Sequence, residues 1–132
     1  MNGRVILLKQ WQDKAGLDIK TIEILTKNKS APRSVIAFHC QQAIEKYLKG
    51  FLCFQQIPFN KTHDLTALLE LCLQKNSAFK LLNNDLMADI KLYAVDPRYP
   101  GEEYEPTKTE IAEYIKTVKQ VKLLVEKLTK NR

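Results

Sequence analysis

The chain has 132 residues, of which 45% are hydrophobic and 27% charged, and its 21 basic and 15 acidic side chains give a net charge of +6. This composition excludes a disordered or low-complexity chain and is typical of one domain with its own core. The charge suits nucleic acid or an acidic partner, and equally a surface charge that only maintains solubility.

The cysteines and the N-terminal segment indicate in which cellular compartment the protein resides. No apolar run reaches the length of a membrane span, and the segment MNGRVILLKQWQD has no signal-peptide pattern. Cys40, Cys53 and Cys72 are odd in number and form no C-x-x-C pair. We therefore expect a cytoplasmic protein with reduced thiols, no membrane contact, no metal site and no cofactor.

Helical periodicity dominates, and no segment alternates as a strand does. A first helix is expected from about Arg4 to Lys27, because the segment NKSAP that follows contains Pro32. Its apolar stripe consists of Leu8, Trp11, Ala15, Ile19, Ile22 and Leu25.

A second helix is expected from about Arg33 to Gln55. Its apolar arc consists of Ile36, Ala37, Cys40, Ala43, Ile44, Tyr47, Leu48 and Phe51. The other arc is expected at the surface and contains His39, Gln41, Gln42, Glu45, Lys46 and Lys49, with Glu45 and Lys49 as an i,i+4 ion pair.

Three residues interrupt the pattern of this second helix. Val35 and Phe38 lie on the polar arc, which predicts a second packing surface and hence a homodimer. Gly50 costs about 1 kcal/mol inside a helix, which predicts that another helix crosses closely there.

The second half of the chain is expected to form three more helices. The third follows THDL, where Thr62 can cap it, and ends near Asn76; its stripe is Leu65, Leu68, Leu69 and Cys72. The fourth covers about Phe79 to Ala94, before DPRYPGEEYEP, whose prolines and glycine preclude regular structure.

The last helix opens with a capping box of Thr107 and Glu110. Its buried stripe consists of Ile111, Tyr114, Ile115, Val118, Val121, Val125 and Leu128. Together these elements predict one domain over residues 1–132, an all-α, antiparallel, up-and-down bundle of about five helices.

Two short segments concentrate residues suited to phosphate. Lys61, His63 and Asp64 in KTHDL either start a helix or use its N-terminal N–H groups to hold an anion. Arg98 lies between the prolines of DPRYP, on a stiff loop that suits either phosphate recognition or an anchoring contact with a glutamate.

Two further patterns are less specific. Arg33 and His39 have an R-x5-H spacing, which puts them on different sides of one helix. The last helix carries a lysine row opposite its apolar stripe, which either binds phosphates or is simply its solvated face. This row consists of Lys116, Lys119, Lys127 and Lys130.

The segments AFHCQQAIEKYLKGFL, KTHDLTALLELC and RYPG, in this order, resemble the HEPN domain family. The resemblance implies a bundle of about five helices that commonly dimerises and is often encoded beside a minimal nucleotidyltransferase, in arrangements similar to toxin–antitoxin modules. Some branches are metal-independent RNases with an R-x(4–6)-H motif near the fourth helix. Arg98 stands about where that arginine is expected, and no histidine follows it.

The resemblance therefore implies a module that binds a nucleotide or RNA phosphate and acts with a minimal nucleotidyltransferase. Lys61, His63 and Arg98 are expected to share one pocket. The full predicted ligand-binding set is Lys61, His63, Asp64, Arg98, Tyr99, Gln42 and Lys46. A metal-independent RNase toxin is the alternative, with catalytic candidates Arg33, His39, His63 and Arg98, and a non-catalytic helical interaction protein is another. We expect that the chain alone does not cleave RNA.

Overall fold

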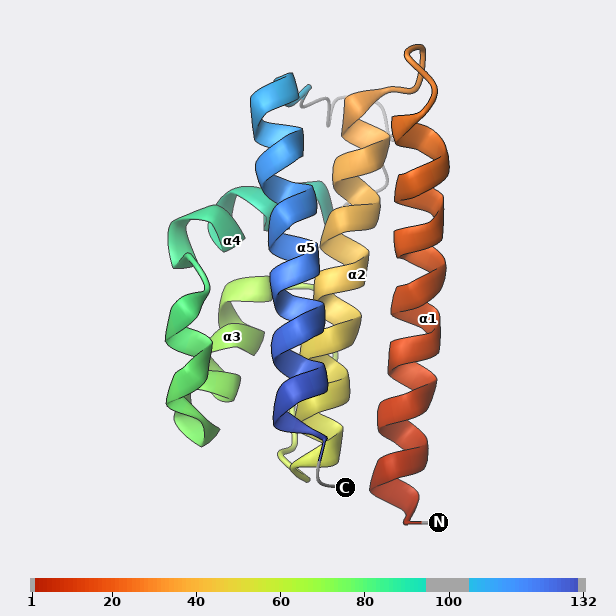
Figure 1. Ribbon diagram of the computed structural model, residues 1–132. Coiled ribbons are helices and arrows are strands. Elements are labelled where there is room, and N and C mark those ends of the chain that lie inside the picture. Colours follow the sequence, from red (N-terminus) through yellow and green to blue (C-terminus); the bar gives the residue numbers. More distant parts are fainter. Residues whose placement is uncertain (1, 95–104, 131–132) are drawn as a thin grey trace.

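The computed structural model describes residues 2–94 and 105–130, which form five α-helices and two short 3₁₀ helices (Figure 1). In chain order they are α1 (Gly3–Thr26), α2 (Arg33–Phe54), α3 (Leu65–Lys75), η1 (Ser77–Leu81), α4 (Asn84–Ile90), η2 (Lys91–Ala94) and α5 (Lys108–Leu128). No strand occurs within these ranges, so the prediction of an all-α bundle of about five helices is confirmed.

Helix α2 is the centre of the bundle (Figure 1). It runs antiparallel to α1 and packs against it, and α5 starts at the same end as α2 and runs beside it in the same direction. The shorter elements α3, η1 and α4 cover the remaining side. The starts of α2 and α5 are tied together, since the backbone N–H of Arg33 donates to Glu105 Oε1 at 3.2 Å and its Nε–H to the Pro106 carbonyl at 2.6 Å.

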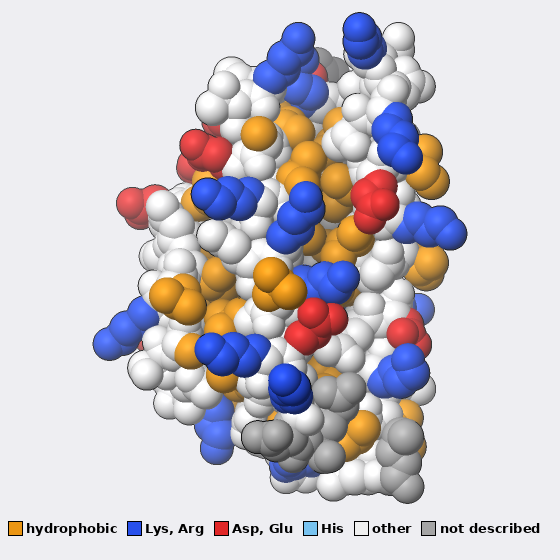
Figure 2. Space-filling view, in the orientation of Figure 1, with side chains coloured by type: hydrophobic (Ala, Val, Ile, Leu, Met, Phe, Trp, Pro, Cys, Tyr) orange, Lys and Arg blue, Asp and Glu red, His pale blue; other side chains and the backbone are white. Residues whose placement is uncertain are grey.

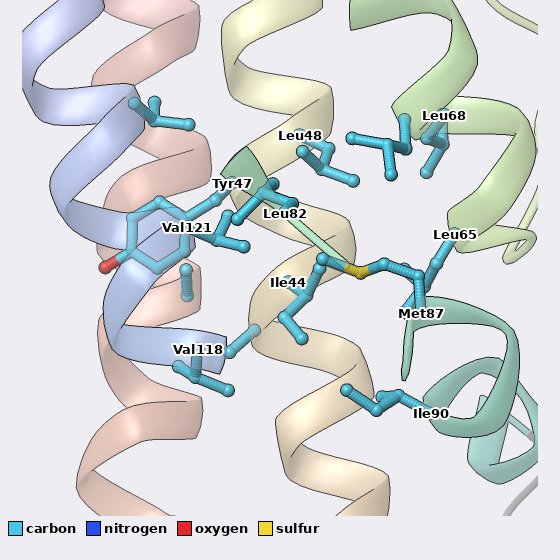
Figure 3. Packing of buried hydrophobic residues seen from close by; sticks show 14 of the residues in the cluster. Ile44, Tyr47, Leu48, Leu65, Leu68, Leu82, Met87, Ile90, Val118 and Val121 are labelled. Carbon is cyan, nitrogen blue, oxygen red and sulfur yellow. The ribbon is translucent and has the colours of Figure 1, made fainter. Parts of the chain in front are cut away.

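The core is built around the apolar arc of α2, as the sequence predicted. Figure 3 shows side chains from α3, α4 and α5 meeting those of α2. The labelled members are Ile44, Tyr47, Leu48, Leu65, Leu68, Leu82, Met87, Ile90, Val118 and Val121, all buried. Helix α1 adds Leu8, Ala15 and Ile22 from its predicted stripe. None of the described helices is long and apolar enough to cross a membrane.

Two local predictions are confirmed by contacts. At the start of α5, Thr107 Oγ1 accepts from the Glu110 N–H and Glu110 Oε1 accepts from the Thr107 N–H, which completes the capping box. A Cβ atom on Gly50 would lie 3.0 Å from Trp11 Cβ of α1, so the glycine allows α1 and α2 to approach closely.

The predicted single helix from Phe79 to Ala94 is wrong. Leu82 has extended backbone angles, and the Asn83 side chain accepts from the Leu86 N–H, so a new helix, α4, begins there. An asparagine side chain offers the backbone this alternative to a continuous helix. The result is η1, α4 and η2 in place of one long helix.

The predicted cap of the third helix is also corrected. Asp64, two residues after Thr62, is the N-cap of α3, and its carboxylate accepts from the N–H groups of Thr66 and Ala67 at 3.0 and 3.3 Å. Thr62 instead accepts from the Asp64 N–H at 3.1 Å. Asp64 takes the position because its carboxylate is the stronger acceptor at the positive end of the helix.

All three cysteines are free thiols; Cys40 and Cys72 are buried and Cys53 is half-buried. Burial raises the pKa of Cys72 to about 12. For Cys40, burial and then the nearby Asp18 carboxylate raise the pKa to about 12. The two buried thiols are therefore inert near neutral pH.

Candidate functional site

Each of the two histidines is held at Nδ1 by a buried carboxylate. His39 Nδ1 lies 2.9 Å from Asp18 Oδ1, and His63 Nδ1 lies 2.8 Å from Glu45 Oε1. The carboxylate side chains are only 9% and 5% exposed, whereas the His63 ring is 67% exposed. Because each carboxylate accepts a hydrogen bond from the Nδ1–H group, the Nε2 atom of each ring is left to contact a ligand.

The carboxylate of Glu45 is fixed from several directions. Its Oε2 accepts from Lys49 Nζ at 2.9 Å, and its Oε1 accepts from Gln41 Nε2 at 3.0 Å. Gln41 Nε2 also donates to the His63 carbonyl at 3.1 Å, so one amide holds both Glu45 and the backbone of His63. Burial raises the pKa of Glu45, but hydrogen bonds from Lys49, Gln41 and His63 outweigh it and hold the pKa below its ordinary value.

The expectation that the polar arc of α2 lies wholly at the surface is wrong. Gln41, Glu45 and Lys49 are 0%, 4% and 6% exposed, although the predicted ion pair of Glu45 and Lys49 does form. Their burial is possible because each polar group finds a partner within the network. Lys49 Nζ also lies over the rings of Trp11 and Phe59, at 5.7 and 6.0 Å from their centroids, within the range of a cation–π interaction.

Asp18 is the site residue that the sequence analysis missed. It comes from α1, and its carboxylate binds both His39 and Lys46 of α2. The signal was present in the sequence, since Asp18 lies three residues after Ala15 and four before Ile22, on the apolar face that α1 buries. A charged residue on such a face indicates a partner on the neighbouring helix.

The two histidines flank one strip of α2. At about 100° per residue, Gln42 lies about 60° around the helix from both His39 and Glu45, the residue that holds His63. Lys46 lies close to His39, because both bind the Asp18 carboxylate. The rings of Phe38 and His39 meet edge to face, with centroids 5.3 Å apart, and Gln42 Nε2 donates to Gln41 Oε1 at 2.7 Å. We name His39, Gln42, Lys46 and His63 the histidine strip.

Lys61 and Asp64 are the other polar residues next to His63 in KTHDL. Lys61 is exposed, two residues before His63. Asp64 is occupied as the cap of α3 and also accepts from Lys91 Nζ of η2 at 3.3 Å. Hydrogen bonds from Thr66, then from the Ala67 N–H and from Lys91, lower the pKa of Asp64. Lys91 is thus a further cation close to KTHDL that sequence reasoning did not identify.

Arg33 and His39 are not brought together. The Arg33 guanidinium contacts Pro106 and Glu105 at the start of α5, whereas His39 faces α1. Arg98 and Tyr99 lie outside the described residues. Within the described ranges no group of histidine, cysteine and carboxylate side chains could hold a metal ion.

The family model of the HEPN domain matches residues 8–128, which include all of α2 to α5 and most of α1. The chain belongs to the HEPN domain family. Searches of curated proteins and of solved structures gave no match to this HEPN domain.

Proposed function

We propose that this HEPN domain binds a phosphate group of a nucleotide or an RNA at the histidine strip, in concert with a minimal nucleotidyltransferase partner. The observation that carries the proposal is the pair of histidines whose Nδ1 atoms are held by Asp18 and Glu45. Two oriented imidazoles with free Nε2 atoms suit the oxygens of a phosphate.

The charges around the strip support an anion as the ligand. Asp18 is already paired with Lys46, and Glu45 with Lys49, so each carboxylate is neutralised without the histidine. A proton taken up by either imidazole therefore adds positive charge to the strip. A bound phosphate favours that protonated form, and exposed Lys61 adds another cation.

Calorimetric titration and thermal unfolding with inorganic phosphate, a mononucleotide panel and short single-stranded RNA test this proposal. A ligand that binds only the native state raises the free energy of unfolding by about 2.7 kcal/mol at a hundredfold excess over its Kd. We expect binding to take up protons, which makes the apparent enthalpy depend on the ionisation enthalpy of the buffer.

Two exposed lysines form a matched pair for the control. Lys61→Ala is expected to weaken nucleotide binding, and Lys119→Ala on α5 to leave it unchanged. Equal losses in both variants would indicate attraction to the net charge alone. Absence of any nucleotide, phosphate or RNA binding would refute the proposal.

The proposed partner is supported by membership of the HEPN domain family, whose members are often encoded beside a minimal nucleotidyltransferase. The test is co-expression with a short nucleotidyltransferase encoded by the adjacent reading frame and purification of a complex. The RNase alternative is tested by incubating the pure protein with RNA in a chelator. Cleavage that disappears in His39→Ala or His63→Ala would replace binding by catalysis as the function.

A further inference from the structure

Two leucines on the face formed by η1 and α5 are left exposed by the described part of the chain. Leu81 and Leu123 are 79% and 65% exposed. They border a hollow of about 370 Å³ between η1 and α5, whose lining is Leu81, Leu82, Gln120, Leu123, Leu124 and Lys127. We name the exposed Leu81 and Leu123, together with the buried Leu82 and Leu124 that also line the hollow, the leucine surface.

A second hollow adjoins the first. Its volume is about 420 Å³, it shares Leu123 and Lys127 with the first, and it extends across α5 to Gln12 of α1. Leu123 therefore stands on a ridge with a depression on either side. Such relief fits the protruding side chains of a folded partner better than a flat lipid surface does.

The surroundings of the leucine surface are basic. From Lys116 to Lys130 the chain has five lysines and one glutamate, a net charge of +4 within a total of +6. Figure 2 shows lysine and arginine side chains spread around apolar patches on this face. A second copy of the chain docked here would bring the same lysines together, which like-charge repulsion opposes.

We propose that the leucine surface docks an amphipathic helix of another protein, whose apolar side chains enter the hollow between η1 and α5 and whose aspartate or glutamate side chains face Lys127 and Lys130 of the second hollow, which is lined mainly by polar residues. An apolar helix face in a groove, flanked by complementary charge, is a common mode of peptide recognition. RNA would pair with the lysines and leave the leucines uncovered. The surface shares no residue with the histidine strip, so the inference stands apart from phosphate binding.

The test uses three labelled synthetic peptides of about 18 residues, or five helical turns. The first has leucines at helical spacing on one face and glutamates elsewhere, the second has lysines in place of the glutamates, and the third has serines in place of the leucines. Fluorescence anisotropy is expected to show binding of the first peptide alone, with Kd on the order of tens of micromolar. Amide signals of the leucine surface in the labelled protein should shift on its addition.

Two leucines of nearly equal exposure supply the matched variants. Leu123→Asp is expected to weaken binding about tenfold or more. Leu17→Asp, at 66% exposure on α1 and outside both hollows, is expected to leave the affinity unchanged. The proposal would be overturned by equal losses in both variants or by equal binding of the lysine peptide. It would also be overturned if the acidic peptide did not bind, or if RNA or anionic lipid vesicles displaced the acidic peptide.

Discussion

Alanine substitution at two helical glycines is expected to change stability in opposite directions. Gly16 lies inside α1 and a Cβ atom there would meet no other atom within 4 Å. Gly16→Ala therefore gains only the helix propensity of alanine over glycine, about 1 kcal/mol. Gly50→Ala gains the same propensity, but its Cβ would lie 3.0 Å from Trp11 Cβ and 3.5 Å from Leu8 Cδ1.

The contact at Gly50 decides the sign there. Carbon atoms pack best at about 3.5–4.0 Å, and Trp11 Cβ is attached directly to the backbone of α1, so the two helices have to move apart. Overpacking of this kind costs about 1–3 kcal/mol. With about 2 kcal/mol lost and about 1 gained, Gly50→Ala is expected to lower the free energy of unfolding by about 1 kcal/mol.

Urea unfolding followed by circular dichroism measures both variants, and thermal scans give a second estimate. At about 2.1 cal/mol/K of unfolding entropy per residue, 1 kcal/mol corresponds to about 4 °C in Tm for a chain of this size. We expect Gly16→Ala to melt above the wild type and Gly50→Ala below it. Equal stabilisation by both substitutions would refute the close approach of α1 and α2.

Three further predictions concern acid stability, thiols and assembly. Glu45→Gln is expected to cost about 3 kcal/mol at pH 7, because Lys49 stays buried without its partner. The Glu45 carboxylate stabilises the fold at pH values above its ordinary pKa of 4.5, and this stabilisation is lost as the pH falls through the lowered pKa of the folded state. The urea midpoint of Glu45→Gln should therefore fall less on acidification than that of the wild type. At pH 8, a thiol reagent should label half-buried Cys53 in the native protein and the two buried cysteines only on unfolding, and equal rates for all three would contradict their burial. Analytical ultracentrifugation at a protein concentration on the order of tens of micromolar should show a dimer that Phe38→Glu dissociates. A monomeric wild type would exclude the dimer.

Much of the fold was predictable because its signals are local. The apolar periodicity of α1, α2 and α5, the proline before α2 and the capping box of α5 each determine backbone geometry within a few residues. The broken helix around Asn83 was not predictable from periodicity. Its apolar spacing continues through the break, and only the side-chain cap of Asn83 decides that α4 starts anew.

The candidate site was predictable only in part. Helical periodicity identifies polar side chains of α2, but it does not show that Gln41, Glu45 and Lys49 satisfy one another and are thereby buried. The contact of Asp18 with His39 joins two helices and depends on how α1 is rotated against α2. Such long-range pairing is a property of the packed bundle and not of either segment.

The most direct test of the central claim is a long-range ¹H–¹⁵N spectrum of the two histidine rings during addition of a mononucleotide. We predict that the Nε2 signals of His39 and His63 shift in proportion to saturation, while both Nδ1 atoms stay protonated and keep donating to Asp18 and Glu45. His63→Gln and His39→Gln assign the two rings. Saturable binding that shifts neither Nε2 signal, or absence of binding, would contradict phosphate recognition by the histidine strip.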